Sequence, residues 1–145
     1  MKQQTQIIAK VDYIGCGAVV TLPQSVEERH GYALREQMLW LLNERIDELV
    51  IDLRRVIFCD SSAAEVVERV RSRTQAMGIR LSLVVTPDSP AERVLRESGL
   101  TRLLAVHPTR AHAEQALAEA ANAARGCAGG GIPAQRRRGG TLLSS

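Results

Sequence analysis

The sequence predicts a single α/β domain with a mixed, mostly parallel β-sheet that opens with a hairpin and is covered by about four α-helices. Short apolar runs of strand length alternate along the chain with segments whose apolar residues recur every three or four positions. Such alternation indicates βαβ units with right-handed crossovers, and therefore parallel strand pairing. A chain of 145 residues that is 45% hydrophobic can bury one core without disulfides or metals.

The N-terminal third of the chain predicts a β-hairpin followed by a helix. Residues 7–14 and 18–22 are rich in strand-forming residues, and Gly15-Cys16-Gly17 between them is a turn sequence. Pro23 ends the second strand, and the polar residues 24–31 are expected to form a connection. A stripe with helical spacing follows, formed by Leu34, Met38, Leu41, Leu42 and Ile46.

The middle of the chain predicts a strand, a short apolar segment and a second helix. Residues 49–53 form an apolar run typical of a strand covered on both faces. A second apolar run at 56–59 precedes Asp60-Ser61-Ser62. An amphipathic helix is expected from Ala63, with Gly78 in the position of a terminating glycine.

The last part of the domain contains the clearest helix start in the sequence. Ser89 can cap the helix, Pro90 suits its first position, and Glu92 can complete a capping box. The expected elements are a strand at 80–85, a helix from Ser89 to Gly99, a strand at 103–106 and a final helix capped by Thr109.

The formal net charge of +3 belongs to the C-terminal end of the chain. Of the 19 Lys and Arg residues, three are Arg136, Arg137 and Arg138, and the remaining 16 equal the 16 Asp and Glu residues in number. A neutral body with four aromatic residues does not resemble a nucleic-acid-binding surface, so no direct nucleic-acid partner is expected. The domain is expected to span residues 5–121, and the Gly- and Arg-rich residues 126–145 are expected to form a flexible tail.

Several classes of site are excluded by the absence of their motifs. The chain has no phosphate-binding glycine loop, no dinucleotide fingerprint and no nucleophile elbow, so we expect neither an enzyme nor a cofactor site. The three cysteines and three histidines have no metal-ligand spacing, and His30 and His107 are expected in exposed loops. No apolar run has the length of a membrane span, and the N-terminus is polar, so we expect a cytoplasmic protein without membrane insertion.

The remaining candidate is Asp60-Ser61-Ser62, between an apolar segment and an amphipathic helix. Ser62 and Glu65 have capping-box spacing, which leaves Ser61 just outside the helix and exposed. Periodicity by itself favours a purely structural helix cap, in which Ser61 has no function. A helix N-terminus also tolerates anions, however, so it can accommodate a phosphate on Ser61. Such a phosphate adds about two negative charges next to Asp60 and Glu65.

Residues 49–62, LVIDLRRVIFCDSS, resemble the signature of the STAS domain, which sulfate transporters share with anti-sigma factor antagonists. In that family an apolar strand ending in Asp-Leu precedes an apolar pair and then Asp-Ser-Ser/Thr-Gly. Residues 84–95 and Ser98-Gly99-Leu100 are similar to the family's next strand and helix and to its closing Gly-Leu. The resemblance covers about residues 5–121 and implies the STAS fold.

The resemblance implies partner switching. Similar bacterial antagonists, when unphosphorylated, bind an anti-sigma factor that is also a serine kinase, which releases the sigma factor. The kinase phosphorylates the first serine of the motif, which matches Ser61, with Ser62 as second choice, and a PP2C-type phosphatase reverses the reaction. ATP belongs to the kinase, so this chain is its substrate and not an enzyme. The implied partner-binding residues are Asp60, Ser61, Ser62, Ala63 and Glu65.

Two other roles fit the same resemblance. One is a STAS accessory subunit of a lipid-type membrane transporter, and the other is a scaffold component of a stress-signalling assembly.

The chain also departs from the family pattern at two places. Ala63 stands where the family has glycine, and Leu22-Pro23-Gln24-Ser25 replaces the Gly-x-Leu/Ile-Asp element that usually follows the second strand.

Overall fold

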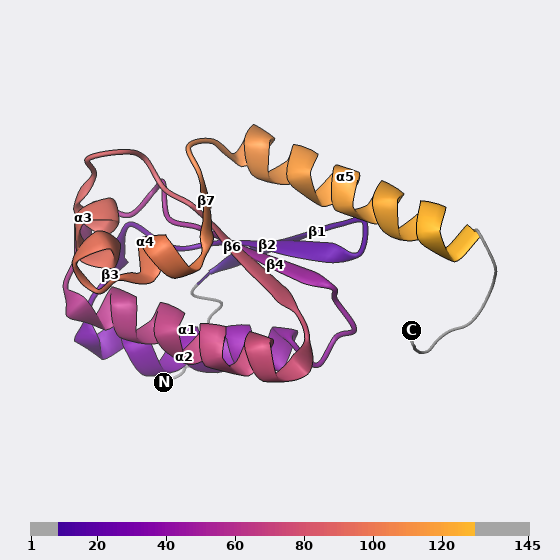
Figure 1. Cartoon of the computed structure of the whole chain (residues 1–145). Coiled ribbons are helices and arrows are strands. Elements are labelled where there is room, and N and C mark those ends of the chain that lie inside the picture. Colours follow the sequence, from indigo (N-terminus) through magenta and orange to yellow (C-terminus); the bar gives the residue numbers. More distant parts are fainter. Residues whose placement is uncertain (1–8, 130–145) are drawn as a thin grey trace.

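The computed structural model of the chain describes residues 9–129, which fold into a three-layer α/β domain (Figure 1). A five-stranded sheet separates helix α5 on one face from α1 and α2 on the other, with α3 and α4 completing that second layer. In chain order the elements are β1 (Lys10–Ile14), β2 (Gly17–Thr21), β3 (Ser25–Val26), α1 (Glu28–Leu41), β4 (Glu48–Asp52), β5 (Phe58–Cys59), α2 (Ser61–Met77), β6 (Arg80–Val84), α3 (Pro90–Glu97), α4 (Leu100–Leu103), β7 (Ala105–His107) and α5 (Arg110–Gly129).

The sheet topology confirms the predicted fold class. The strand order is β1-β2-β4-β6-β7, with β1 antiparallel to β2 and every other pair in this sheet parallel. Gly15, with φ of 59°, makes the left-handed turn that the opening hairpin requires. The described part of the chain has five helices, one more than expected, because the four-residue α4 precedes the last strand.

The prediction of a polar connection over residues 24–31 is wrong. Ser25–Val26 forms strand β3, and α1 already begins at Glu28. The helix starts early because Glu27 and His30 form a capping box, in which the Glu27 N–H donates to Nδ1 of His30 at 3.2 Å. His30 is therefore a helical residue and not a loop residue. The helix ends at Leu41, so Ile46 enters the core from the loop that follows.

Three further boundaries differ from the predictions. The apolar segment at 56–59, for which no strand is predicted, contains strand β5 at Phe58–Cys59, which pairs with β3 in a separate two-stranded parallel sheet. His107, expected in a loop, ends strand β7. Helix α5 continues to Gly129, so the segment expected as tail is helical over residues 126–129, and residues 130–145 lie outside the described part.

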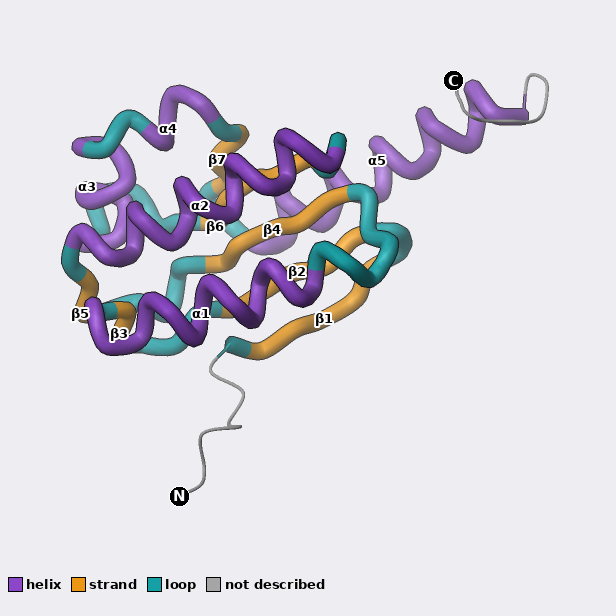
Figure 2. Tube along the Cα trace, turned by 90° about the horizontal axis from the view of Figure 1, so that it is seen from below, coloured by secondary structure: helices purple, strands orange, loops and turns teal. Residues whose placement is uncertain are grey.

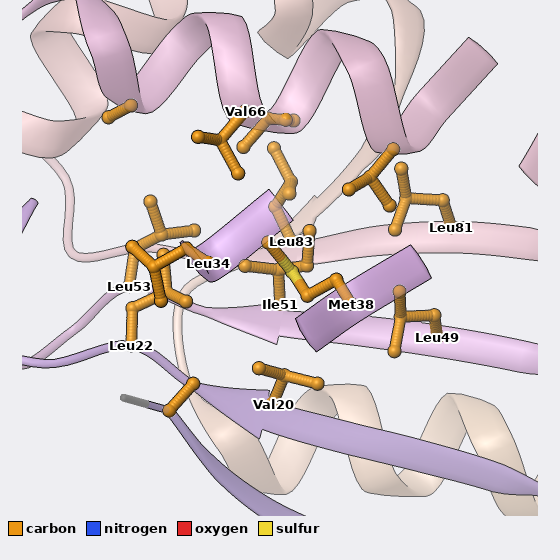
Figure 3. Packing of buried hydrophobic residues seen from close by; sticks show 14 of the residues in the cluster. Val20, Leu22, Leu34, Met38, Leu49, Ile51, Leu53, Val66, Leu81 and Leu83 are labelled. Carbon is orange, nitrogen blue, oxygen red and sulfur yellow. The ribbon is translucent and has the colours of Figure 1, made fainter. Parts of the chain in front are cut away.

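The main core lies between the sheet and α1, α2 and α3, and it is aliphatic (Figure 3). Leu34 and Met38 from α1 and Val66 from α2 pack onto side chains from β2, β4 and β6 and the residues that follow these strands. The labelled residues of the sheet layer are Val20, Leu22, Leu49, Ile51, Leu53, Leu81 and Leu83. The four aromatic residues of the chain contribute nothing to it, because Tyr13, Tyr32, Trp40 and Phe58 are all exposed.

A smaller core joins the opposite face of the sheet to α5. Ala113 and Leu117 pack there onto buried valines of β2, β4 and β6. Gly17 allows this close approach, since a Cβ at that position would lie 2.5 Å from Cδ2 of Leu117. Within the described residues, no helix is both long enough and apolar enough to cross a membrane.

Candidate functional site

The Asp60-Ser61-Ser62 motif lies where β5 ends and α2 begins. Asp60 is the N-cap of α2, and its Oδ1 accepts the backbone N–H of Ser62 at 2.9 Å. The predicted capping box of Ser62 with Glu65 is therefore wrong. An aspartate caps a helix as well as a serine does, so the helix begins two residues earlier than expected. Ser61 is the first helical residue and is not outside the helix.

This register separates the two serines of the motif. Ser61 is exposed, whereas Ser62 is only 8% exposed and faces the same side of α2 as the buried Val66. Ala63 is also buried and belongs to the main core. Of the five residues expected to bind a partner, Asp60, Ser61 and Glu65 lie on the surface, and Ser62 and Ala63 lie beneath it.

The charge on Asp60 is stabilised by its surroundings. Hydrogen bonds from the backbone N–H and the side chain of Ser62 lower the pKa of Asp60, and the backbone of Glu28, at the start of α1, contributes in the same direction. The N-terminal ends of α1 and α2 therefore converge near this carboxylate, with β3 and β5 beside them (Figure 2). Helix N-termini favour negative groups, so this end of the molecule suits an acidic cap.

Cys59, directly before the motif, is half-buried and packs against the main core. Burial raises the pKa of its thiol, and the negative charge of Asp60 raises it further. A reactive cysteine requires a lowered thiol pKa. These features favour the interpretation of Cys59 as a core residue over its interpretation as a redox-active thiol.

A shallow groove of about 810 Å³ runs between α1 and α2 next to the motif. Glu28, Tyr32 and Arg35 line it from α1, and the Arg35 guanidinium lies 5.0 Å from the centre of the Tyr32 ring. Glu65 and Arg69 line it from α2. The start of this α1 wall is not apparent from the sequence, because the polar residues 24–31 predict a connection. The Glu27-x-x-His30 cap was the signal that could have revealed it.

A second feature missed from the sequence is the exposure of Ile57 and Phe58. The run at 56–59 resembles a buried strand by composition, yet Ile57 is 52% and Phe58 62% exposed. Only Val56 and Cys59 of this run pack against the core.

Neither histidine nor acidic clusters provide a metal site in the described part of the chain. No group of three or more His, Cys, Asp or Glu side chains there is arranged to hold a metal ion.

His112 lies in the first turn of α5, where its Nδ1 is 2.8 Å from Oγ1 of Thr109. The Thr109 hydroxyl also accepts the His112 backbone N–H at 3.2 Å, which confirms the predicted cap.

The family model of the STAS domain matches residues 19–116, which is more than half of the chain. The chain belongs to the STAS domain family. The resemblance identified from residues 49–62 and 84–100 is thereby confirmed. No curated protein sequence matches the chain.

Solved structures with the same fold include several anti-sigma factor antagonists. One from Mycobacterium paratuberculosis is 19% identical, with a TM-score of 0.68 over 80% of this chain and 97% of that one. Unphosphorylated SpoIIAA is 16% identical, with a TM-score of 0.66 over 77% of this chain and 96% of that one. The phosphorylated form of SpoIIAA, a Bacillus cell fate determinant, is 19% identical, with a TM-score of 0.60 over 75% and 98%. At these identities the likeness establishes the shared fold.

Proposed function

We propose that this STAS protein is an anti-sigma factor antagonist, which binds an anti-sigma factor with serine kinase activity and is switched off by phosphorylation of Ser61. The observation that carries the proposal is the exposed Ser61 at the first position of α2, next to the buried Ser62. A kinase has to reach the hydroxyl that it phosphorylates, so the exposure supports Ser61 over Ser62. Similar structures named as antagonists, one of them phosphorylated, support the same role.

The proposed switch is electrostatic. A phosphate on Ser61 adds about two negative charges beside Asp60 and one turn from Glu65, both of which are exposed. The N-terminal dipole of α2 offsets about 0.3–1 kcal/mol of the resulting repulsion within the fold. A partner that covers this surface must desolvate the phosphate, and an unpaired charge buried at an interface costs several kcal/mol. Phosphorylation therefore weakens the complex while the domain stays folded.

The proposed role needs no catalytic group in this chain. The anti-sigma kinase supplies ATP, and a PP2C-type phosphatase restores the unphosphorylated form. A partner-switching protein of this kind acts in the cytoplasm and regulates transcription through its protein partner.

The experiment that tests this function is incubation of the chain with ATP and each purified anti-sigma kinase from the same genome, followed by phosphopeptide mass spectrometry. We expect phosphate on Ser61 in the wild type, its loss in Ser61→Ala, and its retention in the matched control Ser62→Ala. Phosphate on Ser62, or none with any of these kinases, would contradict the proposal.

A further inference from the structure

Two large apolar side chains stand on the surface immediately before the motif. Ile57 is 52% exposed and Phe58 is 62% exposed, whereas Val56 on the N-terminal side is buried. Burial of such side chains ordinarily stabilises a fold, so leaving both in water forgoes that stabilisation. An adjacent pair beside a candidate partner surface is therefore a feature to explain.

Backbone hydrogen bonds fix the segment that carries this pair. The N–H groups of Ile57 and Phe58 both donate to the carbonyl oxygen of Gln24, at 2.8 and 3.0 Å. Phe58 is paired with Ser25 in the small parallel sheet, and the next residue, Cys59, packs against the main core. Because successive side chains of a strand point to opposite sides, Phe58 cannot turn inward while Cys59 faces the core. Phe58 is therefore held outward before a partner arrives, which lowers the entropy that binding would cost.

We propose that Ile57 and Phe58 are the apolar anchor of the partner interface and insert into an apolar pocket on the anti-sigma factor. This inference rests on the proposed function, because it assigns a further part of the surface that surrounds Ser61. Binding energy in protein interfaces concentrates in a few large side chains, often aromatic, encircled by polar groups. Next to the motif, the groove offers polar side chains of mixed charge, among them Glu28, Arg35 and Glu65.

The distance from Phe58 to Ser61 favours the anti-sigma factor over a second copy of this chain as the occupant. Three residues span at most about 11 Å. A standard interface covers about 800 Å² on each partner, a patch roughly 30 Å across. A partner whose binding responds to charge at Ser61 therefore also covers Ile57 and Phe58. That partner carries neutral or acidic groups around its pocket, because cationic groups there would attract a phosphate.

The test measures binding of each purified anti-sigma kinase from the same genome to the full chain by titration calorimetry. The variants are Phe58→Ala, Ile57→Ala and Ser61→Asp, with Trp40→Ala as matched control, because Trp40 is 70% exposed on α1 and does not border the motif. We expect Phe58→Ala to weaken binding at least tenfold and Ile57→Ala at least threefold, with melting temperatures unchanged. Trp40→Ala should bind within twofold of the wild type.

The outcomes separate the anchor from the switch. Wild-type affinity of Phe58→Ala and Ile57→Ala, together with weakened binding of Ser61→Asp, overturns the anchor and leaves the proposed function standing. Failure of every kinase to bind the wild type overturns the proposed function and the anchor with it. A wild-type chain that dimerises in analytical ultracentrifugation, and a Phe58→Ala variant that is monomeric, would assign the pair to a second copy instead. A double variant of Phe58→Ala and Ser61→Asp should weaken binding by less than the product of the single effects, because both residues act in one interface.

Discussion

A negative charge is expected to have different consequences at the two neighbouring serines of the motif. Ser61 is exposed at the first position of α2, so an aspartate there remains in water. The helix dipole favours it by about 0.3–1 kcal/mol, and repulsion from the neighbouring Asp60 opposes this gain. The melting temperature of Ser61→Asp should therefore stay within about 3 °C of the wild type.

Ser62→Asp should instead destabilise the fold. Ser62 is 8% exposed and lies one helical turn from the buried Val66, so an aspartate there loses most of its hydration. An unpaired buried charge costs several kcal/mol, and the nearby helix N-terminus offsets about 1 kcal/mol of that cost. We expect a net loss of at least about 2 kcal/mol, which lowers the melting temperature of a domain of this size by about 6 °C or more.

Thermal denaturation followed by circular dichroism measures both stabilities, and titration calorimetry against the anti-sigma kinase measures both affinities. Ser61→Asp should retain its stability and bind at least tenfold more weakly than the wild type. Gln75→Glu is the matched control, because it adds the same charge to an exposed position of the same helix, outside the groove and about 21 Å further along. A Ser61→Asp variant that melts several degrees lower, or a Ser62→Asp variant as stable as the wild type, would refute the assigned register. Equal affinity of Ser61→Asp and wild type for the kinase would refute the phosphorylation switch. That result would favour the alternative role as an accessory subunit of a lipid-type membrane transporter.

Three further predictions concern the fold. Gly17→Ala should lower the free energy of unfolding by about 1–3 kcal/mol in urea denaturation, because the added methyl group overpacks against Leu117. The double variant with Leu117→Ala should lose less stability than the sum of the losses in the single variants. Arg54→Ala should lower the free energy of unfolding by about 3 kcal/mol in the same assay. It leaves the buried Asp52 carboxylate without the guanidinium that binds it at 3.0 and 3.1 Å. A loss of stability below about 1 kcal/mol would contradict this. The lowered pKa of Asp60 stabilises the fold above the ordinary aspartate pKa, and this contribution is lost as pH falls through the lowered value. The melting-temperature difference between wild type and Asp60→Ala should thus be largest near neutral pH and shrink below about pH 4; a difference that grows in acid would be inconsistent with the assignment.

Local patterns in the sequence were sufficient for the fold class and for the position of the motif. The glycine turn at Gly15, the apolar run at 49–53 and the cap at Ser89 each depend on residues close together in the chain. The Ser89 hydroxyl accepts the Glu92 N–H at 3.2 Å, as its sequence neighbours predict. Such features can be recognised without knowledge of distant neighbours, because short-range sterics and hydrogen bonding determine them.

The details of the candidate site depended on tertiary structure. The pattern Asp60-Ser61-Ser62 contains three residues that can each cap a helix, and only the packing of Ala63 and Val66 against the core decides which of them does so. Likewise, composition by itself suggests burial for Ile57 and Phe58, yet both are exposed. Their backbone N–H groups bind the carbonyl oxygen of Gln24, more than 30 residues away in the chain. Burial is a property of what packs on a residue from elsewhere in the chain. The sequence by itself therefore determined where the candidate site lies, and the tertiary structure decided which of its side chains are exposed.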